Sequence, residues 1–170
     1  MGADSKSELP LAFIAAPANE NEKKHAYNLL DKNLQATRGR TERLVADTQY
    51  SSERFREEAA DCSVEAVIPY PTNQHPREKG LLRVDKLFHV HGPKRQVKLY
   101  HKRSADERSN AWLKGFYGLN QLQTRGLENA TIHVTLCVMV SYIIAIAALK
   151  HKRPDLIRSP TLPTKYTHKS

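Results

Sequence analysis

The chain has little cysteine and little glycine, and each shortage excludes a class of protein. Its two cysteines, Cys62 and Cys137, are too few and too far apart for a disulfide framework, so we expect reduced core side chains in the cytoplasm. The 7 glycines are scattered, so the sequence has no glycine-rich phosphate-binding loop. The N-terminus has no basic stretch followed by an apolar run, so we predict no secretory signal.

Basic side chains, by contrast, are abundant and unevenly distributed. Residues 62–170 carry 18 basic and 7 acidic side chains, whereas residues 1–61 carry 9 basic and 11 acidic ones. The span 77–114 alone carries 11 basic and 4 acidic side chains. Such a block of positive charge indicates a polyanionic partner, most commonly nucleic acid, although an ordinary solvated surface can have the same composition.

The first 70 residues alternate between short apolar runs and amphipathic stretches. We predict strands at 9–16, 42–47 and 63–68, and helices at 19–34 and 51–61. Asn19 is the expected cap of the first helix, and Ser51 or Ser52 that of the second. The order of strand, helix, strand, helix, strand predicts an α/β fold with a parallel sheet and crossover helices.

The second half predicts less regular structure and two further helices. We expect a basic insertion or linker segment at 69–102 and a helix at 103–118. A long apolar helix at 128–149 and an irregular tail at 151–170 follow. Within the basic segment, 87–90 and 97–100 would pair as a short hairpin. Trp112 and Phe116 are expected in the core, because they lie one helical turn apart on one apolar face.

The apolar helix raises the question of a membrane. Residues 134–149 carry no charge, and the basic run 150–153 would suit the cytoplasmic flank of a membrane span. A spanning helix needs roughly 20 predominantly apolar residues, whereas this uncharged run has 16. We therefore favour a helix buried in the core and expect no membrane partner, with a membrane-anchored protein as the alternative.

Two carboxylates stand out by their positions. Asp47 follows a predicted buried strand, at the edge of the sheet where α/β proteins bind their ligands. Glu107 lies in the first turns of a predicted helix, beside the basic segment. If that helix packs against the strand, the two carboxylates can share a divalent cation such as Mg²⁺, which prefers hard oxygen ligands. The simpler alternative is that Asp47 caps the turn or helix that follows it.

The residues around Glu107 have a specific spacing. Tyr100, Arg103, Glu107 and Lys114 follow the pattern Tyr-x2-Arg-x3-Glu-x6-Lys. On a helix, Arg103 and Lys114 lie about 40° and about 20° to either side of Glu107, so the three share one face. A surface ion pair is the simplest explanation, although Arg before Glu is the less favourable order for a pair four residues apart. A carboxylate flanked by cations also suits a metal ligand beside phosphates.

This spacing resembles the Tyr-Arg-Glu-Lys signature of insertion-sequence transposases of the DDE type, and all four positions match. The segment RLVADTQYSS at 43–52 is similar to the family's second-carboxylate region, where a strand ending in Ala-Asp is followed by a Tyr and a helix. LPLAFIAAPANENE resembles the strand that enters the first crossover helix, and RGLENATIHVTLCVMVSYIIAIAAL resembles the C-terminal helical end. The resemblance covers roughly residues 8–150.

The resemblance implies a metal-dependent reaction and a set of site residues. In the family, three carboxylates hold two Mg²⁺ or Mn²⁺ ions, which cleave and transfer DNA strands at transposon ends. Asp47 would be the second carboxylate and Glu107 the third, so both would be catalytic and metal-ligating. Tyr100, Arg103 and Lys114 would contact phosphates of double-stranded DNA and stabilise the charge that develops at phosphorus.

The sequence departs from the family pattern at the first carboxylate. The family's first Asp lies on the first of three strands before the crossover helix, but we predict only one strand here; Asp4 is a candidate stand-in that resembles a turn residue. We therefore interpret 1–150 as a partial ribonuclease-H-like domain, truncated at the N-terminus and ending in the apolar helix. We expect a catalytically incomplete transposase portion that forms homo-oligomers, because truncation exposes a sheet edge. The alternative is a non-catalytic basic nucleic-acid-binding protein.

Overall fold

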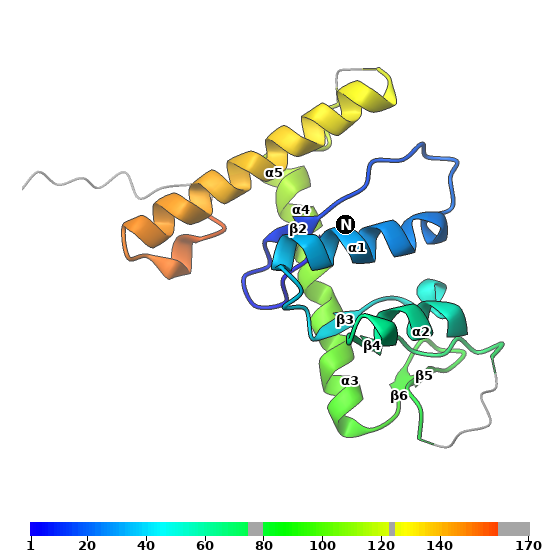
Figure 1. Cartoon of the computed structure of the whole chain (residues 1–170). Coiled ribbons are helices and arrows are strands. Elements are labelled where there is room, and N and C mark those ends of the chain that lie inside the picture. Colours follow the sequence, from blue (N-terminus) through cyan, green and yellow to red (C-terminus); the bar gives the residue numbers. More distant parts are fainter. Residues whose placement is uncertain (75–79, 123–124, 160–170) are drawn as a thin grey trace, which may run out of the picture.

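A computed structural model describes residues 1–74, 80–122 and 125–159 of the chain. In chain order the elements are β1 (Gly2–Ala3), β2 (Pro10–Ala12), the 3-10 helix η1 (Glu22–His25), α1 (Ala26–Thr37), β3 (Arg43–Val45), η2 (Thr48–Tyr50), α2 (Glu53–Asp61), β4 (Glu65–Val67), β5 (Arg83–Val84), β6 (Val90–His91), α3 (Lys94–Tyr100), η3 (His101–Arg103), α4 (Ser104–Phe116), α5 (Leu127–Lys150) and η4 (Pro154–Leu156). The segments α3, η3 and α4 follow one another without a loop and form one long rod. Figure 1 shows α1, α2 and the small sheets beside this rod, and α5 crossing the far end of α4.

The unit β3–α2–β4 forms the centre of the α/β part of the fold. Its two strands are parallel, with Val45 opposite Val67, and α2 is the crossover helix between them. Ser52 caps α2 as predicted, because its side chain accepts a hydrogen bond from the N–H of Phe55. Six buried side chains fill the core between α1, α2 and this strand pair: Ala26, Leu30, Phe55, Ala59, Val64 and Ile68. The predicted α/β class is therefore confirmed.

The strands form three separate pairs within the described residues rather than the single sheet that we predicted. β2 pairs antiparallel with β1, so the prediction of one strand before the first helix is wrong. β1 was missed because two residues are too few for a hydrophobic pattern. The turn between these strands is held by Asp4, whose carboxylate accepts hydrogen bonds from the N–H groups of Lys6 and Ser7. Asp4 is thus a turn residue, and the ribonuclease-H-like arrangement stays a prediction.

Two local predictions are wrong. Asn19 does not cap the first helix; Asn21 caps η1 instead, and α1 begins after it. The predicted hairpin partner at 97–100 lies in α3, and β6 pairs with β5. Val97 and Tyr100 are three residues apart, so a helix turns both toward one core, which a short alternating pattern cannot distinguish from a strand. The basic residues of the segment at 75–79 lie outside the described part of the chain.

α4 buries a face next to the one that we predicted. The buried side chains are Ala105, Ser109 and Leu113, which recur every four residues. The ring of Phe116 is 59% exposed and stacks on Trp112, with 4.5 Å between the ring centroids. The expectation of both aromatic rings in the core is therefore wrong. The error is an offset of one residue along α4, since Leu113 follows Trp112 directly.

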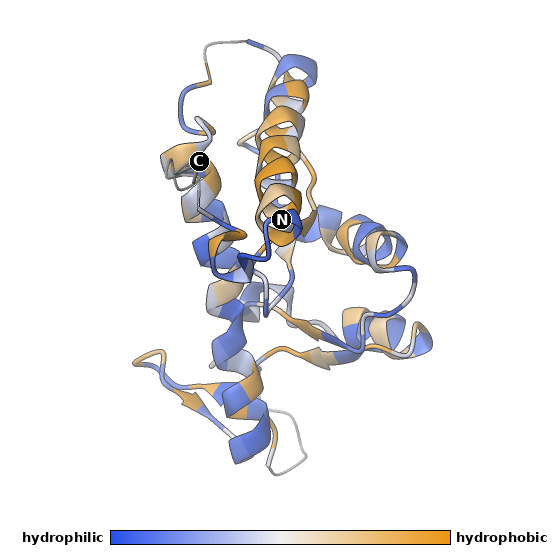
Figure 2. Ribbon diagram, turned by 90° about the vertical axis from the view of Figure 1, so that its left-hand side faces the viewer, coloured by the Kyte–Doolittle hydropathy of each residue, from blue (hydrophilic) through white to orange (hydrophobic). Residues whose placement is uncertain are grey.

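α5 is apolar on nearly all sides, as its orange colour in Figure 2 illustrates. It packs against the rest of the chain on one side only. With 24 residues and a mean hydropathy of 2.3 over its most apolar 18 residues, α5 is long and apolar enough to cross a membrane. Core helices of soluble proteins also meet this criterion. The prediction of a fully buried core helix is wrong, because eight large apolar side chains on α5 are more than two-fifths exposed. Cys137 on this helix is buried as predicted, but Cys62 is exposed.

Candidate metal and DNA-contact site

Asp47 lies directly after β3, where the chain leaves the parallel strand pair. One carboxylate oxygen, Oδ1, accepts hydrogen bonds from the backbone N–H and the hydroxyl of Thr48, so that Asp47 caps η2. The other oxygen, Oδ2, points away from this turn toward the rod. The cap therefore fixes the carboxylate in place and leaves one oxygen available.

Arg103 joins Asp47 to Glu107 across the two parts of the fold. Its Nη1 lies 3.4 Å from Asp47 Oδ2 and 3.0 Å from Glu107 Oε1. The distance between Asp47 Oδ2 and Glu107 Oε1 therefore cannot exceed the sum of these two distances. That upper limit falls within the roughly 4–7 Å expected for two ligands around a pair of metal ions about 3.5–4 Å apart. Residues 60 positions apart thus converge at the junction of β3 and the rod.

The site is open to solvent, and its contacts have simpler functions as well. The Asp47 and Glu107 side chains are 44% and 59% exposed, so water, an ion or a phosphate can reach both. The contacts also match both simpler alternatives of the sequence, a cap formed by Asp47 and an ion pair formed by Arg103 with Glu107. The arrangement thus satisfies a structural and a metal-binding interpretation at once.

The other two signature residues differ in their placement. Tyr100 ends α3 with a buried side chain, and the Arg103 guanidinium lies 5.6 Å from the centre of its ring. Burial raises the pKa of Tyr100, while Arg103 lowers it, and the carboxylates of Asp47 and Glu107 raise it further. Lys114 is exposed on α4, two helical turns beyond Glu107, and makes no ion pair with it. The structure therefore brings together four of the five predicted site residues.

Two polar residues near the site were missed by the sequence analysis. The Tyr50 hydroxyl donates a hydrogen bond of 3.2 Å to Glu22, and its pKa is raised to about 12, first by burial and then by Glu22. Asp106 is partly buried, its Oδ1 is buried with no hydrogen-bond partner among the described residues, and burial raises its pKa. Its position beside the buried face of α4 was the available signal. The one-residue error in predicting that face concealed it.

The donor set limits which metal arrangement fits. Among the residues that the structure describes, no group of three or more His, Cys, Asp or Glu side chains is placed to hold an ion. Mg²⁺ commonly uses one or two protein carboxylates and completes its shell with water and phosphate oxygens. In number, Asp47 and Glu107 therefore suffice for one such ion, but not for the three-carboxylate arrangement that the resemblance implies.

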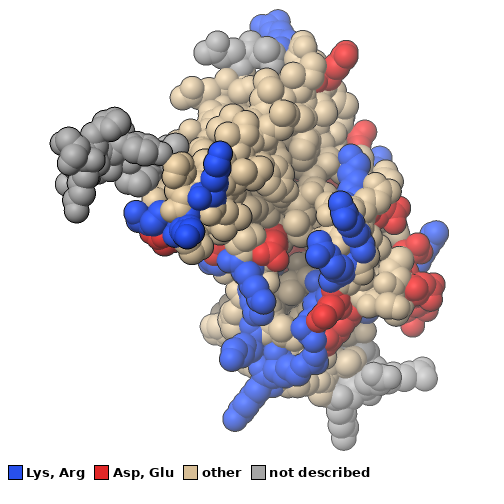
Figure 3. Space-filling model, turned by 60° about the vertical axis from the view of Figure 1, so that its left-hand side comes forward, with Lys and Arg blue, Asp and Glu red and all other residues tan. Residues whose placement is uncertain are grey.

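A row of lysines continues from the site along the rod. Lys94, Lys98 and Lys102 recur every four residues, are exposed, and have no carboxylate of the described chain within ion-pair distance. Neighbouring Arg95 is instead held by Glu65 through two hydrogen bonds of 2.9 and 3.0 Å. Figure 3 shows Lys and Arg side chains gathered on the lower half of one face, at the height of this rod. This lysine row is a surface that suits phosphates.

The comparisons with known proteins agree with the signature. Residues 1–143 match the family model described as Transposase DDE domain. The match spans most of the chain and includes Asp47, Arg103 and Glu107. No curated protein and no solved structure gives a significant match.

Proposed function

Because the chain belongs to the family of transposase DDE domains, whose function is DNA transposition, we propose that Asp47 and Glu107 are two of its metal-binding carboxylates. The observation that carries the proposal is the position of Arg103, which contacts both carboxylates across two separate elements. A guanidinium between two acids occupies a place where positive charge is favoured. A divalent cation is the other kind of group that such a place accepts.

The side chains of the site have separate roles in this proposal. Asp47, fixed by its cap, and Glu107, on the rigid α4, would ligate Mg²⁺ or Mn²⁺. When bound, the ion would activate the attacking oxygen and stabilise the leaving oxygen in phosphoryl transfer. Arg103 would turn from the carboxylates to a DNA phosphate, and the buried ring of Tyr100 positions its guanidinium. Lys114 would contact a phosphate further along α4.

The lysine row would hold the DNA beside these carboxylates. Three cations in a row, with no carboxylate partner among the described residues, can neutralise phosphates of one strand and release their counterions, which gives affinity without sequence preference. The family implies double-stranded DNA at transposon ends as the partner. Because the described residues offer two carboxylates and not three, we further propose that this chain alone cleaves DNA poorly.

Binding of Mn²⁺ to carboxylate variants tests the metal site. Titration followed by the electron paramagnetic resonance signal of free Mn²⁺ should show one site in the whole chain. Asp47→Asn and Glu107→Gln should each weaken binding about tenfold or more, since ligand loss costs at least as much as loss of a ligand's support. The matched control is Glu58→Gln, which removes an exposed carboxylate of α2 and should leave binding unchanged. Equal binding by all four proteins would refute the metal site.

A non-catalytic DNA-binding protein is the second candidate. The observation that favours it is the same donor set, because two half-exposed carboxylates with an arginine between them are also a stable ion-pair network. In this case Asp47→Asn would leave both Mn²⁺ binding and DNA binding unchanged. Under the first proposal the same variant binds the metal about tenfold or more weakly and keeps its affinity for DNA in metal-free buffer.

A further inference from the structure

α5 presents a regular row of exposed apolar side chains on the side away from the rest of the chain. The row, here called the outward stripe, consists of Ile132, Leu136, Met139, Ile143 and Ile146, each 52–64% exposed. The opposite face is buried and consists of Cys137, Val138, Ser141, Ala145 and Ala148. The helix thus has one face used by its own chain and a second apolar face with no partner among the described residues.

The spacing of the outward stripe indicates the kind of partner. Its residues follow one another at intervals of four, three, four and three, which is the a/d pattern of helices that pack along their length. Lipid tails impose no such period, because every side of a spanning helix meets the same solvent. A helix that is apolar all round within a folded domain is covered on both sides.

Three contacts hold α5 so that the outward stripe stays turned away from the chain. His133 Nε2 lies 2.9 Å from the Gly118 carbonyl oxygen, and Cys137 Sγ donates a hydrogen bond to the Tyr117 carbonyl at 3.0 Å. The Tyr142 hydroxyl donates to a backbone carbonyl of β2. These contacts involve the inner face of α5, so its orientation does not depend on anything bound to the outer face.

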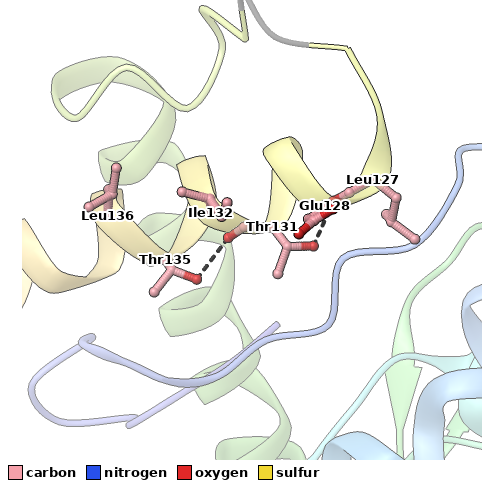
Figure 4. A pocket seen from close by; sticks show the side chains of 6 residues that line it. All are labelled: Leu127, Glu128, Thr131, Ile132, Thr135 and Leu136. Atoms are coloured by element: carbon pink, nitrogen blue, oxygen red, sulfur yellow. Dashed lines mark hydrogen bonds between the residues drawn. The ribbon is translucent and has the colours of Figure 1, made fainter.

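The surface beside the stripe is also prepared for an apolar occupant. A shallow hollow of about 500 Å³ lies along the first half of α5, next to Ile132 and Leu136. Figure 4 shows the side chains that line it. The hydroxyls of Thr131 and Thr135 on its rim donate to backbone carbonyls of their own helix, each at 2.7 Å. Both threonines therefore have their hydrogen bonds satisfied without any ligand, and an apolar side chain can enter without leaving a polar group unpaired.

We propose that the outward stripe binds the same stripe of a second copy of this chain, with the two α5 helices antiparallel. The two ends of α5 differ in charge. Arg125 and Glu128 at the start offset each other, whereas Lys150, Lys152 and Arg153 lie at and beyond the end, where only Arg153 has an acidic partner, Asp155. A parallel pair would bring the two basic ends together. Glu128 and Lys150 lie equally far along the helix from Met139, so an antiparallel pair crossing there places Lys150 beside Glu128 of the partner subunit.

The size of the contact is compatible with a dimer of modest affinity. A 24-residue helix is about 36 Å long, and half the circumference of a cylinder about 10 Å wide is about 16 Å. The contact therefore covers on the order of 550 Å² per copy, or about 1,100 Å² in total. That is just above the roughly 1,000 Å² expected of a specific interface and within the size class of weak, transient contacts. The proposal is independent of the metal site, because no site residue lies on α5.

Sedimentation equilibrium of the whole chain without detergent tests the stripe. We expect reversible dimerisation, with a limiting mass twice the 19.3 kDa of one chain. Ile143→Glu should raise the dimer dissociation constant about 30-fold or more, because it buries a charge in the centre of the contact. Leu87→Glu, at an apolar side chain that is 74% exposed between β5 and β6 and not on α5, should leave it unchanged. Far-UV circular dichroism confirms that both variants fold.

Charge reversal tests the antiparallel arrangement and does not depend on the core. Glu128→Lys and Lys150→Glu should each raise the dissociation constant about fivefold through two symmetric pairs, and the double reversal should restore it. A monomer at all concentrations would overturn the proposal. So would a size that Ile143→Glu does not change. Binding to phosphatidylcholine vesicles that Ile143→Glu and Leu127→Glu, both on α5, weaken equally would also overturn the proposal, because it would assign α5 to a membrane.

Discussion

The β3–rod junction and α5 differ in whether their side chains have partners within the chain. At the junction, polar groups dominate, and the charged side chains of Asp47 and Glu107 both form ion pairs with Arg103. On α5, apolar groups dominate, and the outward stripe finds no partner within the described chain. Figure 3 shows the contrast as tan atoms on the upper part of one face and blue atoms on the lower part. The charges at the junction are paired within the chain itself, whereas the apolar side chains of the outward stripe have no partner among the described residues.

The comparison also separates two sources of stability. Buried apolar side chains around β3 and β4 stabilise the monomer, because folding removes them from water. The outward stripe contributes little to the stability of the monomer, since its side chains remain exposed to water after folding. Its contribution depends on protein concentration if a second copy covers it.

The largest expected effect comes from shortening one isoleucine in each region. Ile68→Ala, at a side chain 1% exposed, should lower the free energy of unfolding by about 2–5 kcal/mol. Ile143→Ala, at one 60% exposed, should lower it by less than about 0.5 kcal/mol in dilute solution. Urea unfolding with equal m-values gives both numbers. A cost for Ile143→Ala that grows with protein concentration would support the dimer, and equal costs in dilute solution would show that α5 is buried in the monomer.

A smaller effect is expected from the arginine that joins the two carboxylates. Arg103→Gln leaves Asp47 and Glu107 facing each other and should lower the free energy of unfolding by about 1 kcal/mol, because the pair is half exposed. Mg²⁺ at 10 mM, about ten times a millimolar dissociation constant, should raise the free energy of unfolding of this variant by about 1.4 kcal/mol. The melting temperature with and without Mg²⁺ measures both changes.

Arg95→Gln is the matched control for this experiment. Arg95 pairs with Glu65 at 2.9 Å and is also exposed, but Glu65 is its only ion-pair partner among the described carboxylates. This variant should lose a comparable amount of stability and gain nothing specific from Mg²⁺. An equal response to Mg²⁺ in both variants would mean that the ion screens charges generally and does not bind between Asp47 and Glu107.

Much of the local structure could be predicted from the sequence, because local signals determine it. The Ser52 cap and the inward positions of Phe55 and Ala59 located α2. The parallel pair β3–β4 followed from the order of its elements. The strand β1 and the true extent of α3 could not be found, because pairing between short strands depends on tertiary contacts that the pattern does not contain.

The site was predicted in part and for a different reason. Spacing on a helix placed Arg103 beside Glu107, and the structure confirms that contact. The approach of Asp47 to this pair came from the family resemblance, since no local rule relates residues 60 positions apart. Asp106 was missed because its burial depends on which face of α4 meets β1, and the predicted face was one residue off. The exposure of α5 could not be predicted, because its composition equally fits a buried helix.

Asp106 offers a smaller effect with a defined dependence on pH. Burial raises its pKa above the ordinary value, so the folded state binds the proton more tightly than the unfolded state does. The protonated carboxyl therefore favours folding below the ordinary Asp pKa of about 3.9, and this contribution is lost as pH rises through the folded-state pKa. Asp106→Asn should raise the melting temperature at pH 7, by about 2–4 °C for each kcal/mol gained, with an advantage that disappears below about pH 4. Asp31→Asn, at an exposed position of α1, is the control and should change little.

The smallest effect should distinguish the two regions by their affinity for DNA. Lys98→Gln removes one unpaired cation of the lysine row and should weaken binding to a random duplex a few-fold, with the slope of log affinity against log salt reduced by about 1. Lys152→Gln removes an exposed cation just beyond α5 and should change neither quantity. Fluorescence anisotropy across a salt series measures both. Because the two substitutions change the net charge equally, different slopes place the phosphates along the rod, whereas equal slopes would show that DNA responds only to the charge of the whole chain.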